Sequence, residues 1–192
     1  MEFIKQKISS SIELKSRLLQ SDTILSSVEK IVDEIITCYA NGGKVLFCGN
    51  GGSAADAQHL AAELSGRFYY DRPPLFSEAL HVNTSYVTAV ANDYSYDEIY
   101  SRYIAGSGRK GDVLIGLSTS GNSMNVIRAL QKGNELGMIT VALTGETGGK
   151  MKEHSKYLIN IPSTDTPRIQ ECHMLLGHTI CELVESKIFP KK

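Results

Sequence analysis

The sequence predicts a single domain over residues 1–192, folded as a three-layer α/β/α sandwich with a parallel sheet. Short apolar runs of strand length alternate with longer segments of helical periodicity, and short loops join them. This alternation produces right-handed βαβ crossovers and a parallel sheet with helices on both faces. Apolar residues make up 42% of the 192 residues, which is enough to bury a substantial core.

An N-terminal helical hairpin is predicted over residues 1–41, ahead of an α/β core with a C-terminal helix over residues 42–192. Apolar residues recur at helical spacing from position 2 to 20, and Ser21 or Asp22 then begins a second helix. The hairpin carries more apolar surface than one flanking layer needs. We therefore expect part of it to pack against another subunit.

Strands and helices alternate through the rest of the chain. The predicted strands cover residues 45–48, 78–82, 113–117, 138–143 and 157–161. The predicted helices begin with Ser53 and Ser85 as N-caps or cover residues 97–105, 126–136 and 168–187. In such a sheet, ligands bind beyond the carboxyl ends of the strands.

Composition and charge exclude several classes of function. The formal net charge is −1, so bulk electrostatics do not favour nucleic-acid binding. No run of about 18 apolar residues is present, and the N-terminus lacks the apolar core of a signal peptide. We therefore expect a cytoplasmic protein with no membrane partner. The four cysteines show no CxxC pairing and are expected to be buried, reduced thiols, with a nucleophilic Cys48 as the alternative.

The first polar loop, at residues 49–52, reads Gly-Asn-Gly-Gly and leads into the helix that Ser53 is expected to cap. Its glycines let the backbone approach a ligand, and a helix N-terminus favours an anion. Further along this helix, His59 and Glu63 stand at i and i+4 and so share one face. The sequence therefore predicts a small polar ligand at the loop and acid/base chemistry on the helix.

The second polar loop, at residues 118–123, reads Ser-Thr-Ser-Gly-Asn-Ser and follows the clearest predicted strand. Its four hydroxyls and the amides of the next helix can surround a phosphate without a fixed positive charge. No lysine stands where a nucleoside triphosphate loop needs one. The pattern favours a phosphate site over the alternative, a serine-rich turn with an N-cap.

These motifs together resemble the sugar isomerase (SIS) domains, and more closely the phosphoheptose isomerases. The likeness covers essentially the whole chain. The serine loop alone marks only the wider domain class, whereas the pairs His59/Glu63 and Gln170/His178 are more specific. The matching segments are residues 48–53, 59–67, 91–94, 118–123 and 143–145, and residues 168–171 with His173 and His178.

The resemblance implies a flavodoxin-like fold, a homotetramer with active sites where subunits meet, and conversion of D-sedoheptulose 7-phosphate to D-glycero-D-manno-heptose 7-phosphate. This reaction is the entry step to the heptose of bacterial surface polysaccharides. The resemblance also implies the site residues. These are Glu63 and His178 for acid/base catalysis; Ser118, Thr119, Ser120 and Ser123 for the phosphate; Asn50, Gly51, Gly52, Ser53, Asn92, Asp93 and Gln170 for the sugar; and His59, Glu63, Gln170 and His178 for a zinc ion.

Aldose–ketose isomerisation moves a proton between adjacent carbons through an enediol, which a carboxylate base and a second proton carrier can perform. Glu63 suits the base if burial raises its pKa; a solvated helix carboxylate is the alternative. His178 stands in an apolar helix, where a core histidine is the alternative, and His173 is expected to be structural. Gln170 and His178 are eight residues apart, about 12 Å of helix, so both reach one zinc ion only by leaning toward each other.

Two other functions remain open from the sequence. One is isomerisation of a shorter phosphosugar, such as arabinose 5-phosphate, by another SIS enzyme. The other is a non-catalytic SIS protein of the kind that binds the bacterial replication initiator. Such a protein can keep the fold and the serine loop without the catalytic pairs, so the presence of both pairs favours catalysis.

Overall fold

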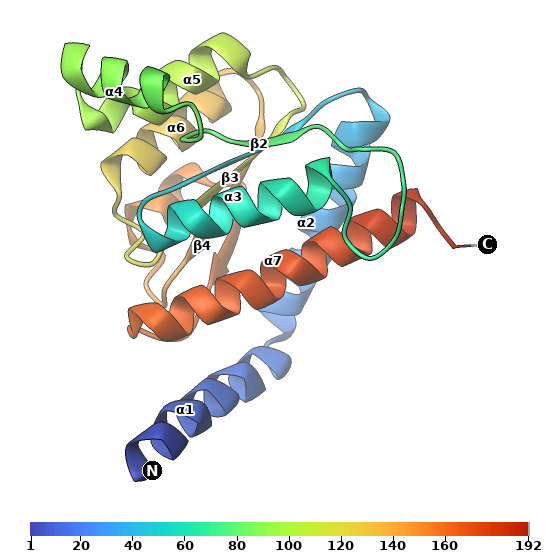
Figure 1. Ribbon diagram of the computed structural model, residues 1–192, viewed down its shortest axis with the longest axis vertical. Coiled ribbons are helices and arrows are strands. Elements are labelled where there is room, and N and C mark those ends of the chain that lie inside the picture. Colours follow the sequence, from blue (N-terminus) through green and yellow to red (C-terminus); the bar gives the residue numbers. More distant parts are fainter. Residues whose placement is uncertain (192) are drawn as a thin grey trace.

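A parallel five-stranded sheet lies between two layers of helices in the computed structural model, which describes residues 1–191 (Figure 1). The strands are β1 (Val45–Gly49), β2 (Ser77–Ala79), β3 (Val113–Ser118), β4 (Ile139–Thr144) and β5 (Tyr157–Asn160). Their order is β2-β1-β3-β4-β5, and every neighbouring pair is parallel. This is the flavodoxin-like order of a doubly wound sheet. The predicted fold class is therefore confirmed.

Helices precede the sheet and cover both of its faces. They are α1 (Glu2–Leu19), α2 (Asp22–Ala40), α3 (Gly52–Ser65), α4 (Thr84–Asp93), α5 (Ile99–Ser107), α6 (Met124–Glu135) and α7 (Thr166–Ile188), with 3₁₀ turns η1 (Tyr96–Glu98) and η2 (Gly149–His154). Alternate residues of β1 explain the two layers. Val45 and Phe47 belong to the core formed with α2, α3 and α7, whereas Leu46 and Cys48 belong to the core formed with α5 and α6.

Three local boundaries differ from the prediction. Helix α3 starts at Gly52 with Gly51 as its N-cap at φ 55°, so the prediction of Ser53 as the cap is wrong. A positive φ of this size favours glycine, and the backbone therefore sets this boundary. Helix α4 is capped by Asn83, whose side chain accepts a hydrogen bond from an amide of the first turn, so the prediction of Ser85 as that cap is also wrong. Of the predicted strand at 78–82, only residues 78 and 79 belong to β2, which begins at Ser77 and has three residues.

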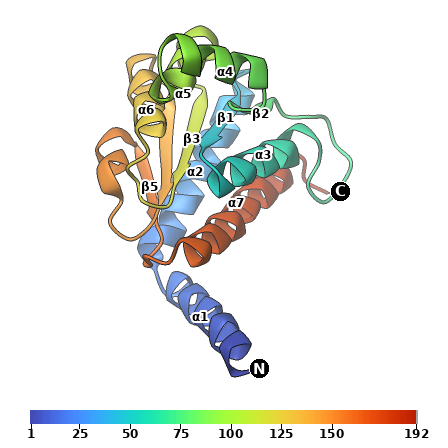
Figure 2. The ribbon, with the colours of Figure 1, turned by 60° about the vertical axis from the view of Figure 1, so that its left-hand side comes forward.

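The two N-terminal helices are present, but α1 projects from the body of the molecule (Figure 2). Ser21 caps α2 by accepting a hydrogen bond from the backbone N–H of Ile24. The apolar face of α1 is exposed to solvent in the single chain. Its more than half-exposed apolar residues are Phe3, Ile4, Ile8, Ile12 and Leu19. A face of this composition is typical of a protein interface, and its packing against another subunit stays a prediction.

The four cysteines are all buried and free, as predicted. Burial raises the pKa of the Cys48 thiol, which disfavours the thiolate that a nucleophile needs. Within the described residues, no helix combines the length and the apolar character needed to cross a bilayer.

His173 is a core residue, as predicted. It is fully buried, and its Nε2–H donates to the carbonyl of Thr144 at 3.1 Å, while Nδ1 has no hydrogen-bond partner within the described residues. Burial lowers the pKa of His173 to about 4. The folded chain therefore holds a neutral imidazole in its core across the mildly acidic range.

We expect His173 to make the protein less stable as the pH falls from about 6.5 toward 4. In this interval the unfolded chain binds a proton that the folded chain excludes, so protonation favours unfolding by about 3 kcal/mol at the lower end. Denaturant unfolding across the interval should show this slope in the wild type and in a His154→Gln control, and a flatter slope in His173→Gln. An unchanged slope in His173→Gln would contradict the assignment.

Candidate active site

Two imidazoles and a carboxylate meet on the surface that α3 and α7 share. His59 and Glu63 lie one turn apart on α3, with 2.9 Å between Nε2 and Oε1. His178 reaches across from α7, and its Nε2 lies 3.4 Å from Nε2 of His59. The two helices approach closely here: a Cβ added to Gly177 would lie 2.6 Å from the nearest atom of the Leu60 side chain. The i, i+4 spacing predicted that His59 and Glu63 share a face of α3. The close packing of α7 on α3 brings His178 next to them.

The donor set of this triad suits a metal ion. One ligand atom from each of His59, Glu63 and His178 lies within 4.8 Å of the other two. Two imidazole nitrogens and a carboxylate oxygen form a ligand set typical of catalytic zinc, with a fourth position left for water or substrate. His59 is exposed, and Glu63 and His178 are partly buried. The triad is therefore accessible from solvent.

Gln170 lies in a cleft of about 630 Å³ that also reaches His178. Its amide packs on the start of α3, where a Cβ added to Gly52 would lie 2.2 Å from Nε2 of Gln170. Only glycine leaves room for this contact. Gln170 and His178 remain two turns apart on α7. The Gln170 amide therefore lies beside the start of α3, whereas the His178 imidazole lies beside His59.

Asp56 is a residue of this cleft that the sequence analysis did not single out. Its Oδ2 is buried without a hydrogen-bond partner among the described residues. Burial raises the pKa of Asp56, and the charge of His59 partly offsets that effect. The available signal was its position three residues before His59, which places both on one face of α3.

Asn50 joins the first polar loop, residues 49–52 (the glycine loop), to α6, the helix that follows the serine loop. Its side-chain amide exchanges two hydrogen bonds of 2.9 Å with the buried amide of Asn125 in α6, and the Tyr96 hydroxyl donates to its Oδ1 at 3.2 Å. The other residues predicted for the sugar, Asn92 and Asp93, end α4 and are exposed. Their side chains bond to each other at 3.0 Å. Within the described chain, no hydrogen bond joins these two to the glycine loop or to the triad.

The serine loop converges on the N-terminus of α6. The hydroxyl of Ser118 lies 2.9 Å from that of Ser123 and 3.4 Å from that of Ser120. Gly121 has φ 66°, and a Cβ there would lie 2.3 Å from the carbonyl oxygen of Gly148, so the loop requires glycine at this point. Thr119 and Ser120 also line a pocket of about 200 Å³. Hydroxyls gathered at a helix N-terminus form an environment that favours a phosphate.

The serine loop and the triad are separate within one chain. Both polar loops lie at the carboxyl edge of the sheet, where β1 and β3 end side by side. Glu63 is eleven residues beyond Gly52 on α3, which is about 16 Å along the helix axis. A single chain therefore presents two half-sites, one rich in hydroxyls and one rich in acid/base groups.

Comparison with known proteins identifies relatives that share this fold. The SIS domain model matches residues 10–145. The phosphoheptose isomerase of Aneurinibacillus thermoaerophilus is 51% identical over 191 residues, which cover 100% of this chain and 96% of that protein. The phosphoheptose isomerase of Mycobacterium tuberculosis is 52% identical over 179 residues, 93% of this chain and 91% of that protein.

Solved structures give the same result. The phosphoheptose isomerase of Neisseria gonorrhoeae superposes with a TM-score of 0.90 at 41% identity, covering 96% of this chain and 98% of that one. The corresponding enzyme of Francisella tularensis gives 0.91 at 32% identity, covering 96% and 97%. Fold and site together define a SIS-domain sugar isomerase. Within that class, the chain belongs to the phosphoheptose isomerase family, a family of aldose–ketose isomerases, which confirms the resemblance drawn from its motifs.

Proposed function

We propose that this protein converts D-sedoheptulose 7-phosphate to D-glycero-D-manno-heptose 7-phosphate. The names of its relatives support a phosphorylated heptose as substrate. The observation that carries the proposal is the meeting of Glu63 and His178 with His59, in a chain that also gathers serine hydroxyls at a helix N-terminus. The first cluster suits proton transfer and the second suits a phosphate.

The substrate is held at both ends in this proposal. The phosphate is bound by the hydroxyls of Ser118, Thr119, Ser120 and Ser123. The sugar hydroxyls and the carbonyl are bound by Asn50, Gly51, Gly52, Ser53, Asn92, Asp93 and Gln170. These residues supply mostly neutral hydrogen-bonding groups, which match a polyhydroxylated chain and discriminate by position rather than by charge.

Glu63 and His178 carry the proton transfers. Glu63 removes the proton from C1 of the ketose as its carbonyl oxygen at C2 gains a proton, which forms the enediol, and it returns the proton to C2. His178 donates a proton to the C2 oxygen and accepts one from the C1 hydroxyl, so charge and protons balance over the cycle. A zinc ion held by His59, Glu63 and His178 would polarise the substrate oxygens during these transfers, and Gln170 would join these ligands only by leaning along α7 toward His178.

We further propose a homotetramer with active sites between subunits. The exposed apolar face of α1 supports an association of chains. The serine loop lies beside the glycine loop, and Glu63 is about 16 Å along α3 from the glycine loop. This separation supports sites shared by two chains, because the reacting carbons and the phosphate of one heptulose phosphate lie closer together than this. A partner's serine loop completes the site.

Turnover of defined substrates tests the proposed function. Purified protein should convert sedoheptulose 7-phosphate to the aldoheptose phosphate and should leave a pentulose 5-phosphate unchanged. Preferential turnover of the pentulose would assign the chain to a different phosphosugar. No turnover of either substrate by folded, zinc-loaded protein would favour a binding function.

Removal of bound metal is expected to lower the turnover of sedoheptulose 7-phosphate by about a hundredfold, because polarisation by a metal ion is worth several kcal/mol. Chelation followed by gel filtration and assay measures this effect. Zn²⁺ should restore activity and Mg²⁺ should not, since two imidazoles favour zinc over magnesium. Full activity in metal-free protein would assign the reaction to acid/base transfer alone.

A further inference from the structure

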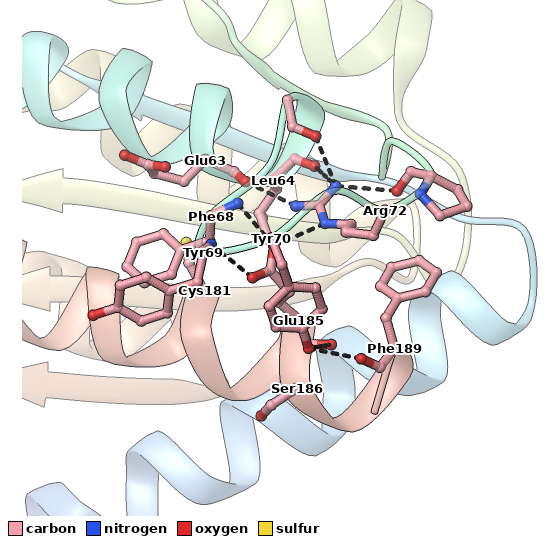
Figure 3. Close-up of polar contacts among 12 residues, drawn as sticks. Glu63, Leu64, Phe68, Tyr69, Tyr70, Arg72, Cys181, Glu185, Ser186 and Phe189 are labelled. Atoms are coloured by element: carbon pink, nitrogen blue, oxygen red, sulfur yellow. Dashed lines mark hydrogen bonds and ion pairs between the residues drawn. The ribbon is translucent and has the colours of Figure 1, made fainter. Parts of the chain in front are cut away.

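A buried ion pair between Arg72 and Glu185 lies at the C-terminal ends of α3 and α7 (Figure 3). Nε of Arg72 donates to Oε2 of Glu185 at 3.0 Å, and the two side chains are only 2% and 1% exposed. Arg72 belongs to the segment that follows α3, and Glu185 stands in the last turns of α7. Burying both charges is costly unless every polar atom of the pair is satisfied.

Glu185 holds the segment that follows α3 against α7. Its carboxylate accepts hydrogen bonds from the backbone N–H groups of Phe68 at 2.7 Å and Tyr69 at 2.8 Å, in addition to the bond from Arg72. Burial alone would raise the pKa of Glu185, but the two amides and the guanidinium together lower it. The carboxylate therefore stays ionised in the core.

Arg72 closes the C-terminus of α3. Its guanidinium donates to the carbonyl of Glu63 at 2.9 Å, of Leu64 at 2.7 Å and of Gly66 at 3.0 Å. The last carbonyls of a helix have no partner within the helix, and the negative end of its dipole favours a cation there. One planar side chain thus fixes the turn of α3 that carries Glu63, while its Nε–H bonds α7 through Glu185.

The same pair fixes the surroundings of His178. Glu185 lies seven residues, about two turns, beyond His178 on α7. The ring of Phe68, whose N–H the carboxylate holds, lies 5.8 Å from the imidazole of His178 between centroids. Tyr69 packs edge-on against Phe68 at 4.5 Å. The ion pair therefore contacts the elements that place Glu63 and the elements that place His178.

We propose that Arg72 and Glu185 are positioning residues, which set the placement of Glu63 relative to His178; this inference rests on the proposed function. Stability alone does not require a buried ion pair, because well-packed apolar residues often replace one without loss. An apolar pair has no means of bonding three carbonyls and two amides at once. The charged pair instead ties α3, α7 and the segment between them into one geometry.

Arg72→Lys and Glu185→Gln test the proposal, with Asp112→Asn as the matched control. Asp112 is also buried and likewise accepts hydrogen bonds from two backbone N–H groups, those of Lys44 and Arg109, and from one cation, the Lys44 ammonium. It directly precedes β3, and none of these bonds involves α3, α7 or the segment that follows α3. The steady-state kinetics and the affinity for Zn²⁺, by calorimetry, are measured where circular dichroism shows each variant folded.

We expect Arg72→Lys and Glu185→Gln to lower kcat and the Zn²⁺ affinity about tenfold each, with KM within about twofold, because the triad is displaced while the phosphate site is not. Asp112→Asn should lower the melting temperature and leave kcat and the Zn²⁺ affinity unchanged. Unchanged kcat and affinity in the folded pair variants would overturn the proposal, as would an equal loss in Asp112→Asn.

A fourth variant covers the case in which the pair variants fail to fold. Phe68→Leu keeps the ion pair and the backbone N–H but removes the ring beside His178. It should lower kcat and Zn²⁺ affinity in the same sense, and an unchanged Phe68→Leu beside unfolded pair variants would assign Arg72 and Glu185 to stability alone. If the wild type binds Zn²⁺ but does not turn over the heptulose phosphate, the proposed function fails while the affinity measurement still decides the positioning role.

Discussion

Replacement of Glu63 with glutamine is expected to reduce the turnover of sedoheptulose 7-phosphate by about 10²–10⁴-fold, the usual worth of a positioned acid/base group. The amide has the size of the carboxylate and can still accept a hydrogen bond from His59, 2.9 Å away in the wild type. It has no basic oxygen to take a proton from C1. The loss should therefore fall on kcat, and the fold should be retained.

Solvent deuterium provides a sharper readout than the rate alone. The wild type should incorporate deuterium from D₂O at C1 or C2 of recovered sugar, because the carboxylate exchanges the proton it carries. Glu63→Gln should lose this incorporation, and Glu182→Gln, a change at an exposed glutamate of α7, should retain both incorporation and rate. His178→Gln should also be slowed. Wild-type rates in both Glu63→Gln and His178→Gln would remove these residues from the mechanism.

The sequence predicted β1 and β3 well because these strands are buried on both faces. All residues of β1 and β3 are buried, so they read as short continuous apolar runs between helices. It placed helix starts less well, because those depend on single backbone angles. At α3, the positive φ of Gly51 sets the start, whereas a serine one residue into the helix carried the expected capping signal.

The candidate site was only partly accessible to sequence reasoning. Spacing along one helix predicted that His59 and Glu63 share a face. No spacing rule joins residues 119 positions apart, so the contact of His59 with His178 depends on the packing of α3 against α7 and was available only through the family resemblance. Spacing did correctly indicate the separation of Gln170 from His178 along α7.

The ion pair of Arg72 and Glu185 was missed because charged residues are rarely buried. A signal was present at Glu185. It follows Val184 on the buried face of α7 and lies four residues after the buried Cys181, so a carboxylate stands where helical periodicity places an apolar residue. Arg72 carried a weaker signal, since it stands in an irregular segment before two prolines. Its role follows from three carbonyls that only the folded chain brings together.

Two inactive variants should regain activity when they are combined in one oligomer. Glu63→Gln removes the base. Ser120→Asp places a negative charge beside the hydroxyls of the serine loop, where it repels the substrate phosphate. If each site takes its base from one chain and its serine loop from another, random mixing leaves both parts intact in about a quarter of the sites. Each variant alone should remain inactive.

The recovered activity decides between one-chain and two-chain sites. The two variants are co-expressed with different affinity tags, mixed oligomers are isolated through both tags, and native mass spectrometry gives their composition. Activity near a quarter of the wild type supports a site built from two chains. If each site were built from one chain, every site would carry one of the two substitutions and stay inactive. Mixed oligomers as inactive as their parents would place base and phosphate loop in the same chain. The distance of about 16 Å along α3 would then have to be spanned by movement of the loops.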